Sequence, residues 1–217
     1  MTTRKTFPQH HEAEIPPHIK GLIFDCDGTL IDTMPIHYQA WCKTLADFGM
    51  DFPEPRFYSF AGMPTRLIVE TLCREQGKNL DPDHVAHLKE KVYLKMMPKA
   101  PMIREVVAIA RREKGRRKLA VASGGWHSIV VESLTHAGIL NLFDAIVGAD
   151  DVVHGKPAPD MFLKAAELMG LTATDCIVYE DGEPGFQGAH AAKIPVIDVR
   201  PWYLPPQEVL RRAPQPK

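Results

Sequence analysis

Two carboxylates lie two residues apart directly after a short apolar segment. Asp25 follows Gly21–Phe24, Asp27 comes after one intervening cysteine, and Gly28 is next. In extended backbone, residues i and i+2 point to the same side, so both carboxylates can face one ligand. Two carboxylates this close are costly unless a proton or a cation lies between them. The pair therefore predicts a divalent-cation site, with a turn capped by aspartates as the ordinary alternative.

Three further polar features follow apolar segments that read as buried strands. Ser123 precedes two glycines and a predicted helix, so its hydroxyl and the next N–H groups can hold phosphate oxygens. Lys156 lies in a loop that prolines keep out of helical conformation. Glu180 and Asp181 supply the oxygen ligands that magnesium prefers. A helix cap, a surface lysine and a solvated turn are the ordinary explanations, but four such features at four strand ends favour one shared phosphate site.

The segments that must position these residues alternate between short buried strands and helices. This alternation is typical of an α/β fold with a Rossmann-like, doubly wound parallel sheet, in which ligands bind at the carboxyl ends of the strands. The predicted strands are Gly21–Phe24, Leu119–Ala122, Ala145–Val147, Ile177–Tyr179 and Val196–Val199, and the predicted helices include Pro35–Gly49, Ser128–His136, Pro159–Met169 and Phe186–Ala192.

An inserted small helical domain interrupts this alternation. From Asp51 to Ala100 the apolar residues keep helical spacing, and no segment reads as a strand. The predicted organisation is a flexible leader at 1–18, a core made of 19–33 and 101–200, a helical cap at 34–100 and a Pro-rich tail at 201–217. The tail holds five of the 19 prolines, and we expect it to pack only partly.

Composition narrows the class of partner. The formal net charge of −1 gives no global field that would recruit nucleic acid or an acidic membrane surface. The four cysteines are widely spaced without a CxxC pair, which favours neither a zinc site nor disulfides and is typical of a reducing cytoplasm. No signal peptide or membrane-spanning segment is predicted. We therefore expect a cytoplasmic protein that recognises a small molecule.

The order of these features resembles the four motifs of the haloacid dehalogenase superfamily of phosphotransferases. The segments FDCDGTLIDT, HGKPAPDMF and YEDGEPG carry the resemblance, which runs from about Gly21 to Arg200. Within the superfamily the chain looks most like the subgroup of β-phosphoglucomutases and sugar-phosphate phosphatases, which have a small helical cap. The resemblance implies phosphoryl transfer through an aspartyl-phosphate intermediate with Mg²⁺. Asp27 disfavours dehalogenation, because dehalogenases do not use this second aspartate.

The resemblance also implies roles for the core residues. Asp25 would attack phosphorus, and Asp27 would protonate the leaving oxygen and later deprotonate water. Asp27 must then start protonated, which requires a pKa raised by burial or by Asp25. The Mg²⁺ ligands would be the Asp25 carboxylate, the Asp27 backbone carbonyl and Asp181, with Glu180 ligating directly or supporting a ligand. The phosphoryl oxygens would be held by Thr29, Ser123, Gly124 and Lys156.

Cap residues are the candidates for substrate contacts. His37 and Trp41 match the subgroup and lie four apart on one predicted helix, where they can share a face toward the site. Simple packing is the alternative for Trp41, and a polar helix face is the alternative for His37. Lys89 is a further candidate, with a solvated helix lysine as its alternative. His127, beside the phosphate loop, is the candidate on the core side.

The cap loop distinguishes a phosphatase from a mutase. Mutases of the subgroup place an arginine just after the glycine of this loop, where it binds a second phosphate. In this chain the loop is Gly62–Arg66, in which Thr65 holds the position of that arginine and Arg66 comes one residue later. We therefore expect a phosphatase, monomeric as most of the subgroup are, that acts on small phosphorylated metabolites such as fructose 1-phosphate, with Thr65 and Arg66 as candidate substrate residues. The alternatives are a β-phosphoglucomutase-type mutase and a non-catalytic ligand-binding domain on the same fold.

Overall fold

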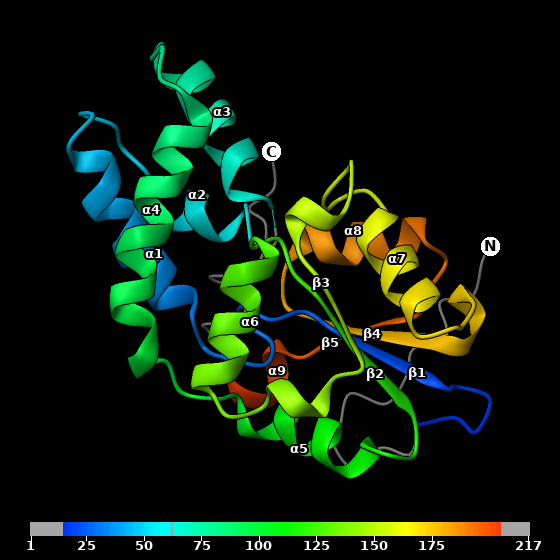
Figure 1. The fold of residues 1–217 in the computed structure, drawn as a ribbon. Coiled ribbons are helices and arrows are strands. Elements are labelled where there is room, and N and C mark those ends of the chain that lie inside the picture. Colours follow the sequence, from blue (N-terminus) through cyan, green and yellow to red (C-terminus); the bar gives the residue numbers. More distant parts are fainter. Residues whose placement is uncertain (1–14, 62, 205–217) are drawn as a thin grey trace.

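The computed structural model describes residues 15–61 and 63–204, which form an α/β core and a helical cap (Figure 1). The core holds one parallel sheet in the strand order β3-β2-β1-β4-β5, which confirms the predicted fold class. The strands are β1 (Gly21–Phe24), β2 (Lys118–Ala122), β3 (Ala145–Val147), β4 (Cys176–Glu180) and β5 (Val196–Asp198).

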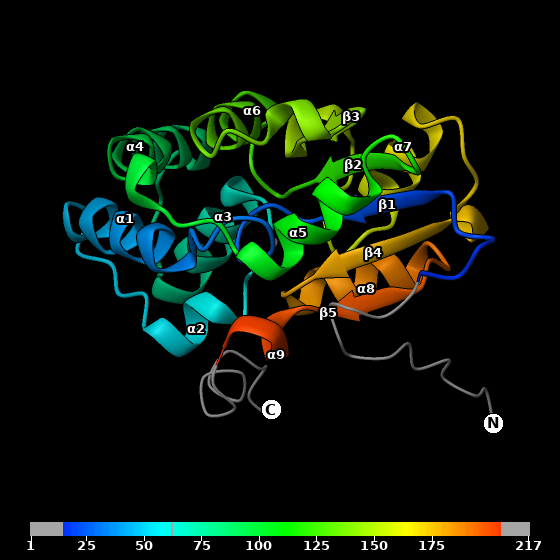
Figure 2. The same cartoon turned by 90° about the horizontal axis from the view of Figure 1, so that it is seen from below.

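The helices of the core lie in layers on the two faces of the sheet (Figure 2), and successive strand residues pack against opposite layers. On one face, Phe24 and Tyr179 stack with ring centroids 4.8 Å apart and belong to a core shared with α5 (Arg104–Glu113) and α6 (His127–His136). On the other face, Ile23 and Val178 pack with α7 (Asp160–Leu168) and α8 (Glu183–Ala191). The strands β1, β2 and β4 are therefore buried on both faces, as their near-continuous apolar segments predict, whereas the edge strands β3 and β5 are mostly half-buried.

The strand register brings the polar residues to one edge of the sheet. Phe24 of β1 is aligned with Val121 of β2 and with Tyr179 of β4. Since the strands are parallel, the residues that follow these three positions all emerge at the same carboxyl edge.

The cap contains four helices that pack on each other. They are α1 (Met34–Ala46), α2 (Glu54–Tyr58), α3 (Thr65–Gln76) and α4 (Pro82–Met96), followed by a 3-10 turn at Met97–Lys99. Trp41, Val69 and Val85 are among the fully buried members of its core. Asp81 caps α4, because its side chain accepts a hydrogen bond of 3.0 Å from the Asp83 N–H.

The chain enters and leaves the cap at adjacent points. Ile31 and Met102 form an antiparallel bridge, and Asp32 N–H donates to the Pro101 carbonyl at 2.9 Å. The cap loop also touches two core loops at glycines. A Cβ on Gly155 would lie 2.5 Å from Pro64 Cγ, and a Cβ on Gly182 would lie 2.6 Å from the Ala61 carbonyl oxygen. The absence of side chains at these glycines lets the cap rest closely on the core.

Element boundaries differ from the sequence predictions at a few places. Helix α1 ends at Ala46 rather than Gly49, which itself takes the left-handed conformation with φ 59°. Helix α8 begins at Glu183, three residues before the predicted start, because Pro184 is tolerated in a first turn.

The chain ends are also packed further than expected. Helix α9 (Arg200–Tyr203) crosses into the predicted tail, and the Trp202 ring packs edge-on against Tyr179. At the other end, the Ile15 carbonyl accepts from Arg117. The rest of the leader (1–14) and of the tail (205–217) lies outside the described residues. Among the helices of the described ranges, none has the length and apolar character needed to cross a bilayer.

The layered core gives a stability prediction. Leu134 in α6 is completely buried, whereas Leu163 in α7 is 43% exposed. We expect Leu134→Ala to lower the free energy of unfolding by about 2–5 kcal/mol, because it leaves a cavity against the sheet. The matched Leu163→Ala change should stay within about 0.5 kcal/mol. Urea titrations of both variants would measure this, and equal losses would contradict the described packing.

Candidate active site

A buried lysine joins two of the predicted carboxylates. Lys156 Nζ donates to Asp25 Oδ1 at 2.6 Å and to Glu180 Oε2 at 2.8 Å, and all three side chains are buried. The second Glu180 oxygen, Oε1, accepts from the N–H groups of Asp181 at 3.0 Å and Gly182 at 2.9 Å. Both Glu180 oxygens are therefore used, and its structural role is to hold Lys156 against Asp25.

The same carboxylates fit a divalent cation. Asp25, Glu180 and Asp181 each offer an oxygen, and these three oxygens lie within 4.8 Å of one another. Burial and then the charge of Glu180 raise the pKa of Asp25 to about 8, although Lys156 opposes this. Burial, Glu180 and Asp25 likewise raise the pKa of Asp181. One buried ammonium leaves negative charge in excess, which a cation relieves. Because Glu180 is already bonded, Asp25 and Asp181 are the carboxylates best placed to ligate it.

Asp27 has a different set of partners. Its Oδ1 accepts from the Thr33 hydroxyl at 2.6 Å and from His37 Nε2 at 3.0 Å, and its Oδ2 accepts from the Ser123 hydroxyl at 3.3 Å. Burial alone would raise the pKa of Asp27. The imidazole of His37, the hydrogen bond of Thr33 and the charge of Lys89 outweigh burial and hold this pKa well below 3.8. The raised pKa that the acid role requires is therefore not met in this structure, because His37 and Lys89 of the cap approach Asp27 in a way that the sequence does not reveal.

A lysine of the cap determines how His37 is oriented. Lys89 Nζ lies 2.7 Å from His37 Nδ1, and an ammonium can only donate hydrogen bonds. Neutral His37 thus accepts at Nδ1 and carries its hydrogen on Nε2, where it donates to Asp27. The imidazole also stacks on Tyr93, with ring centroids 3.9 Å apart. Lys89 is only 2% exposed, so the alternative of a solvated lysine is wrong.

The predicted phosphate residues gather at the same edge. Ser123 is buried, and its Oγ accepts from Gly125 N–H at 3.1 Å in the turn before α6. Gly124 lines the cavity beside it. Thr29 is also buried, but its hydroxyl donates to Asp181 Oδ1 at 3.3 Å. In this structure the Thr29 side chain therefore supports one of the carboxylates that could hold a metal ion.

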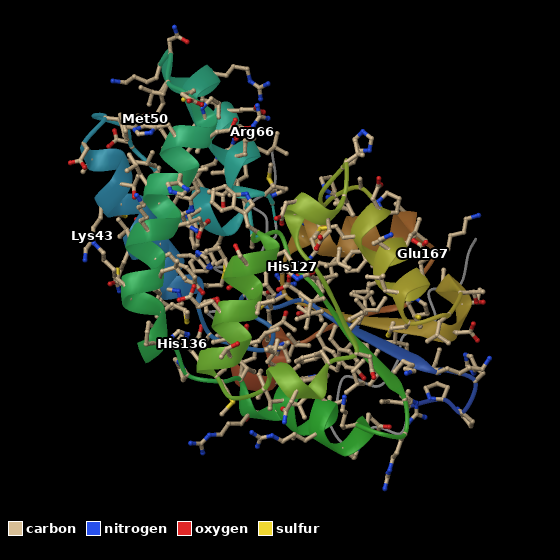
Figure 3. All side chains as sticks on the ribbon, viewed as in Figure 1. Lys43, Met50, Arg66, His127, His136 and Glu167 are labelled. Atoms are coloured by element: carbon tan, nitrogen blue, oxygen red, sulfur yellow. The ribbon has the colours of Figure 1, made fainter. Side chains whose placement is uncertain are left out.

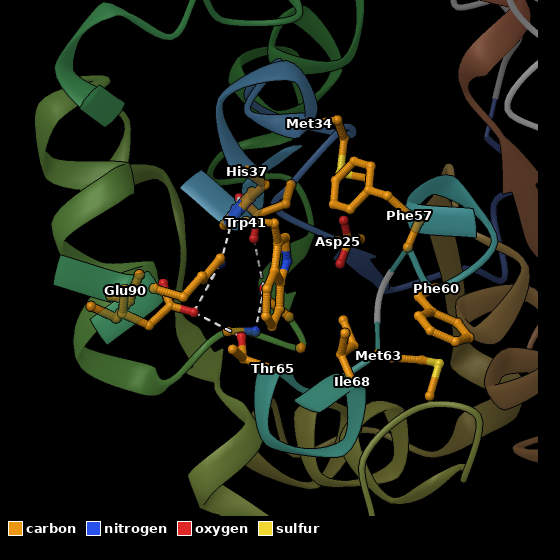
Figure 4. A pocket seen from close by; sticks show the side chains of 17 residues that line it. Asp25, Met34, His37, Trp41, Phe57, Phe60, Met63, Thr65, Ile68 and Glu90 are labelled. Carbon is orange, nitrogen blue, oxygen red and sulfur yellow. Dashed lines mark hydrogen bonds and ion pairs between the residues drawn. The ribbon is translucent and has the colours of Figure 1, made fainter. Parts of the chain in front are cut away.

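The cavity lies between the carboxyl edge and the cap (Figure 4). Asp25, Asp27 and the Ser123 turn form its core side. Trp41, Thr65 and Lys89 line the cap side, so the structure places these three predicted residues at the site. Trp41 is also 1% exposed and packs edge-on against Phe52, so it is part of the cap core as well as of the cavity wall.

Two predicted substrate residues, both labelled in Figure 3, are not among the residues that line the cavity. Helix α3 begins at Thr65, and a step of one residue turns Arg66 toward the outer face of the helix. There Arg66 pairs with Glu70 at 2.6 Å and Asp83 at 3.0 Å and is 54% exposed. The His127 ring instead bonds Asp151 at 2.6 Å. The structure thus gives neither Arg66 nor His127 a contact with the site.

Sequence reasoning also missed residues that line or support the cavity. Thr33 was part of the FDCDGTLIDT segment, but only the bend between β1 and α1 returns its hydroxyl to Asp27. Glu90 stands in an LKEK stretch that reads as a solvated helix face, yet it is 4% exposed. The apolar lining comes mostly from the cap: Met34, Phe57, Phe60, Ala61, Met63 and Ile68, with Ile129 from α6.

Comparisons with known proteins agree with this geometry. Residues 22–199 match the model of the family described as haloacid dehalogenase-like hydrolase. The chain is 38% identical over 180 residues to the fructose-1-phosphate phosphatase YqaB of Escherichia coli, covering 83% of this chain and 96% of the relative. It is 27% identical to a phosphorylated carbohydrates phosphatase of Thermotoga maritima, covering 81% of this chain and 82% of the relative.

Solved structures show the same fold. A hydrolase from Pseudomonas syringae matches with a TM-score of 0.77 and 25% identity, over 89% of this chain and 90% of that one. The β-phosphoglucomutase of Clostridium difficile matches with a TM-score of 0.76 and 21% identity, over 89% of this chain and 96% of that one. With the family model covering most of the chain and the motif residues meeting at one sheet edge, the chain belongs to the haloacid dehalogenase-like hydrolase family.

Proposed function

We propose that this hydrolase is a Mg²⁺-dependent phosphatase that acts on small phosphorylated metabolites, sugar phosphates such as fructose 1-phosphate among them, through an aspartyl-phosphate intermediate. The observation that carries the proposal is that Asp25 and Asp27 face one cavity, where Asp25 is held by Lys156 and Asp27 by His37. The similarity to the fructose-1-phosphate phosphatase of Escherichia coli and to the phosphorylated carbohydrates phosphatase of Thermotoga maritima supports the class of substrate.

The contacts support a division of labour between the two aspartates. Asp25 attacks phosphorus, and the bond from phosphorus to the substrate's bridging oxygen breaks. Lys156 and the Ser123 turn offset charge on the phosphoryl oxygens. Water then attacks phosphorus, the bond from phosphorus to the Asp25 oxygen breaks, and inorganic phosphate leaves, while Asp27, which has given up its proton and is held ionised by its lowered pKa, accepts a proton from the water. When bound, Mg²⁺ would supply electrostatic stabilisation of the same oxygens.

The leaving oxygen needs a proton before Asp27 can act as a base. The phosphate dianion of a substrate brings negative charge beside Asp27, and a nearby like charge raises the pKa of a carboxyl. Substrate binding thus favours proton uptake by Asp27, which then donates the proton to the leaving oxygen. The same residue serves as acid in the first step and base in the second.

The cap favours hydrolysis over a mutase reaction. A mutase must hold both phosphates of a bisphosphate, and Arg66 points away from the cavity. Thr65, in the position of the mutase arginine, bonds Glu90 at 2.7 Å. A non-catalytic binding domain is disfavoured because Asp25, Asp27 and Lys156 are all present at the site. That the enzyme is monomeric and cytoplasmic, and that it binds neither nucleic acid nor membranes, stays a prediction.

The first test uses the nucleophile. Asp25→Asn should lower phosphate release from a sugar-phosphate panel by about 10³-fold or more, because the amide does not attack phosphorus. The matched Asp47→Asn change, at an exposed aspartate of the cap, should leave release unchanged. Inorganic phosphate and isomerised product are both measured, with Mg²⁺ or with chelator. Release that persists in Asp25→Asn or in chelator would contradict the proposal, and isomerisation in excess of release would indicate the mutase.

A second test follows from the pKa of Asp25, which is about 8 in the metal-free fold against an ordinary 3.8. A carboxyl that folding keeps protonated stabilises the fold at low pH, and this contribution is lost as pH rises toward the folded pKa. In chelator, stability should therefore fall from about pH 5 to about pH 8, by up to about 1.4 kcal/mol per pH unit for each such group.

Denaturant titrations with chelator would measure this slope in the original protein and in Asp25→Asn. The variant should show a shallower slope, since its side chain does not ionise. Mg²⁺ should stabilise the original protein more at pH 8 than at pH 5, because the metal binds the ionised carboxylates. Equal slopes in both proteins, or no Mg²⁺ effect at either pH, would contradict the described metal site.

A further inference from the structure

One carboxylate of the cavity is not explained by the proposed reaction. Glu90 lies on α4, is 4% exposed and lines the cavity on its cap side. Its Oε1 accepts from the Thr65 hydroxyl at 2.7 Å and from Lys89 at 3.0 Å (Figure 4). Its other oxygen, Oε2, is buried and has no hydrogen-bond partner among the described residues. A buried carboxylate oxygen without a donor is costly, so this one calls for a missing donor.

The same carboxylate changes the charge of the cap wall. Lys89 is shared between His37 Nδ1 and Glu90 Oε1, so its positive charge is balanced by Glu90. The other cap residues named in the lining are apolar apart from Thr65 and His37. Among the described residues, the cap therefore presents a hydrogen-bond acceptor and no uncompensated cation to the part of a substrate that lies away from Asp25.

We infer that Glu90 determines specificity in this enzyme: Oε2 accepts a hydrogen bond from a hydroxyl of the substrate, and its charge excludes substrates that carry a second phosphoryl group. The inference rests on the proposed phosphatase activity and deepens it. A polyhydroxylated monophosphate supplies the missing donor, whereas a bisphosphate would place a dianion beside a buried carboxylate. Rejection by an unpaired or like-charged group is an effective source of selectivity.

The test compares three phosphate esters in each variant. Fructose 1-phosphate offers hydroxyls, fructose 1,6-bisphosphate adds a second phosphate, and p-nitrophenyl phosphate has neither and serves as the internal reference. In Glu90→Gln, kcat/KM for fructose 1-phosphate relative to the reference should fall about 10-fold. The ratio for the bisphosphate relative to fructose 1-phosphate should rise about 10-fold or more, because the repelling charge is gone. Ratios within one preparation do not depend on its folded fraction.

Two further variants separate the effects of charge and position. Glu90→Asp keeps the charge but withdraws the oxygens, so it should still reject the bisphosphate while losing preference for fructose 1-phosphate over the reference. Glu75→Gln removes an exposed cap carboxylate that pairs with Arg56, and both ratios should stay at their original values.

The outcomes distinguish this inference from the proposed function. If either ratio in Glu90→Gln stays at its original value, the specificity role is overturned, and a parallel fall for all three esters would show that Glu90 only positions Lys89. If the original protein with Mg²⁺ releases phosphate from none of the three esters, the proposed function fails first.

Discussion

The site is built around one buried ammonium group. Lys156 holds the carboxylates of Asp25 and Glu180 at hydrogen-bond distance in a region without solvent, where a lone charge would be very unfavourable. The strand ends meet there because the parallel register aligns β1 with β4, and the loop before α7 supplies the lysine. Asp181 adds a third carboxylate and leaves the charge unbalanced. The fold thus keeps an excess of negative charge at the point where a cation and a phosphoryl group would meet.

The cap contributes to the chemistry as well as to the walls of the cavity. Asp27 belongs to the core, but the ring that bonds its Oδ1 comes from α1 of the cap, and that ring is oriented by Lys89 of α4. The hydrogen bonds continue from Lys89 to Glu90 and from Thr65 to Glu90. A single polar chain therefore runs from the start of α3 to Asp27, so the ionisation of Asp27 depends on residues distant in sequence.

The sequence predicted the core far better than the cap. Asp25, Ser123 and Asp181 could be placed together because each comes at the end of an apolar strand, and parallel strands bring such positions to one edge. Lys156 lies further along the chain, in the loop between β3 and α7. No comparable rule places helical side chains of an inserted domain. Arg66 was one helical step out of position, and Glu90 was hidden in a stretch with the composition of a solvated surface. The lowered pKa of Asp27 was missed because its cause is three-dimensional, the approach of His37 and Thr33.

The bridge between Ile31 and Met102 has a consequence for how such a protein can change. Because the chain leaves the core and returns to it at neighbouring points, the inserted helices close a loop whose ends are already held together by backbone hydrogen bonds. The entropy cost of closing a loop grows only slowly with its length, so the core is little affected by the size of what is inserted there. Recognition can therefore diversify by replacing or lengthening the insertion, while the phosphoryl-handling edge is inherited unaltered. Gly182 and Gly155 limit such an exchange, because they lie directly against Ala61 and Pro64 of the insertion. A new insertion must also fit closely against the core at these two points, where the core has no side chain that could move aside.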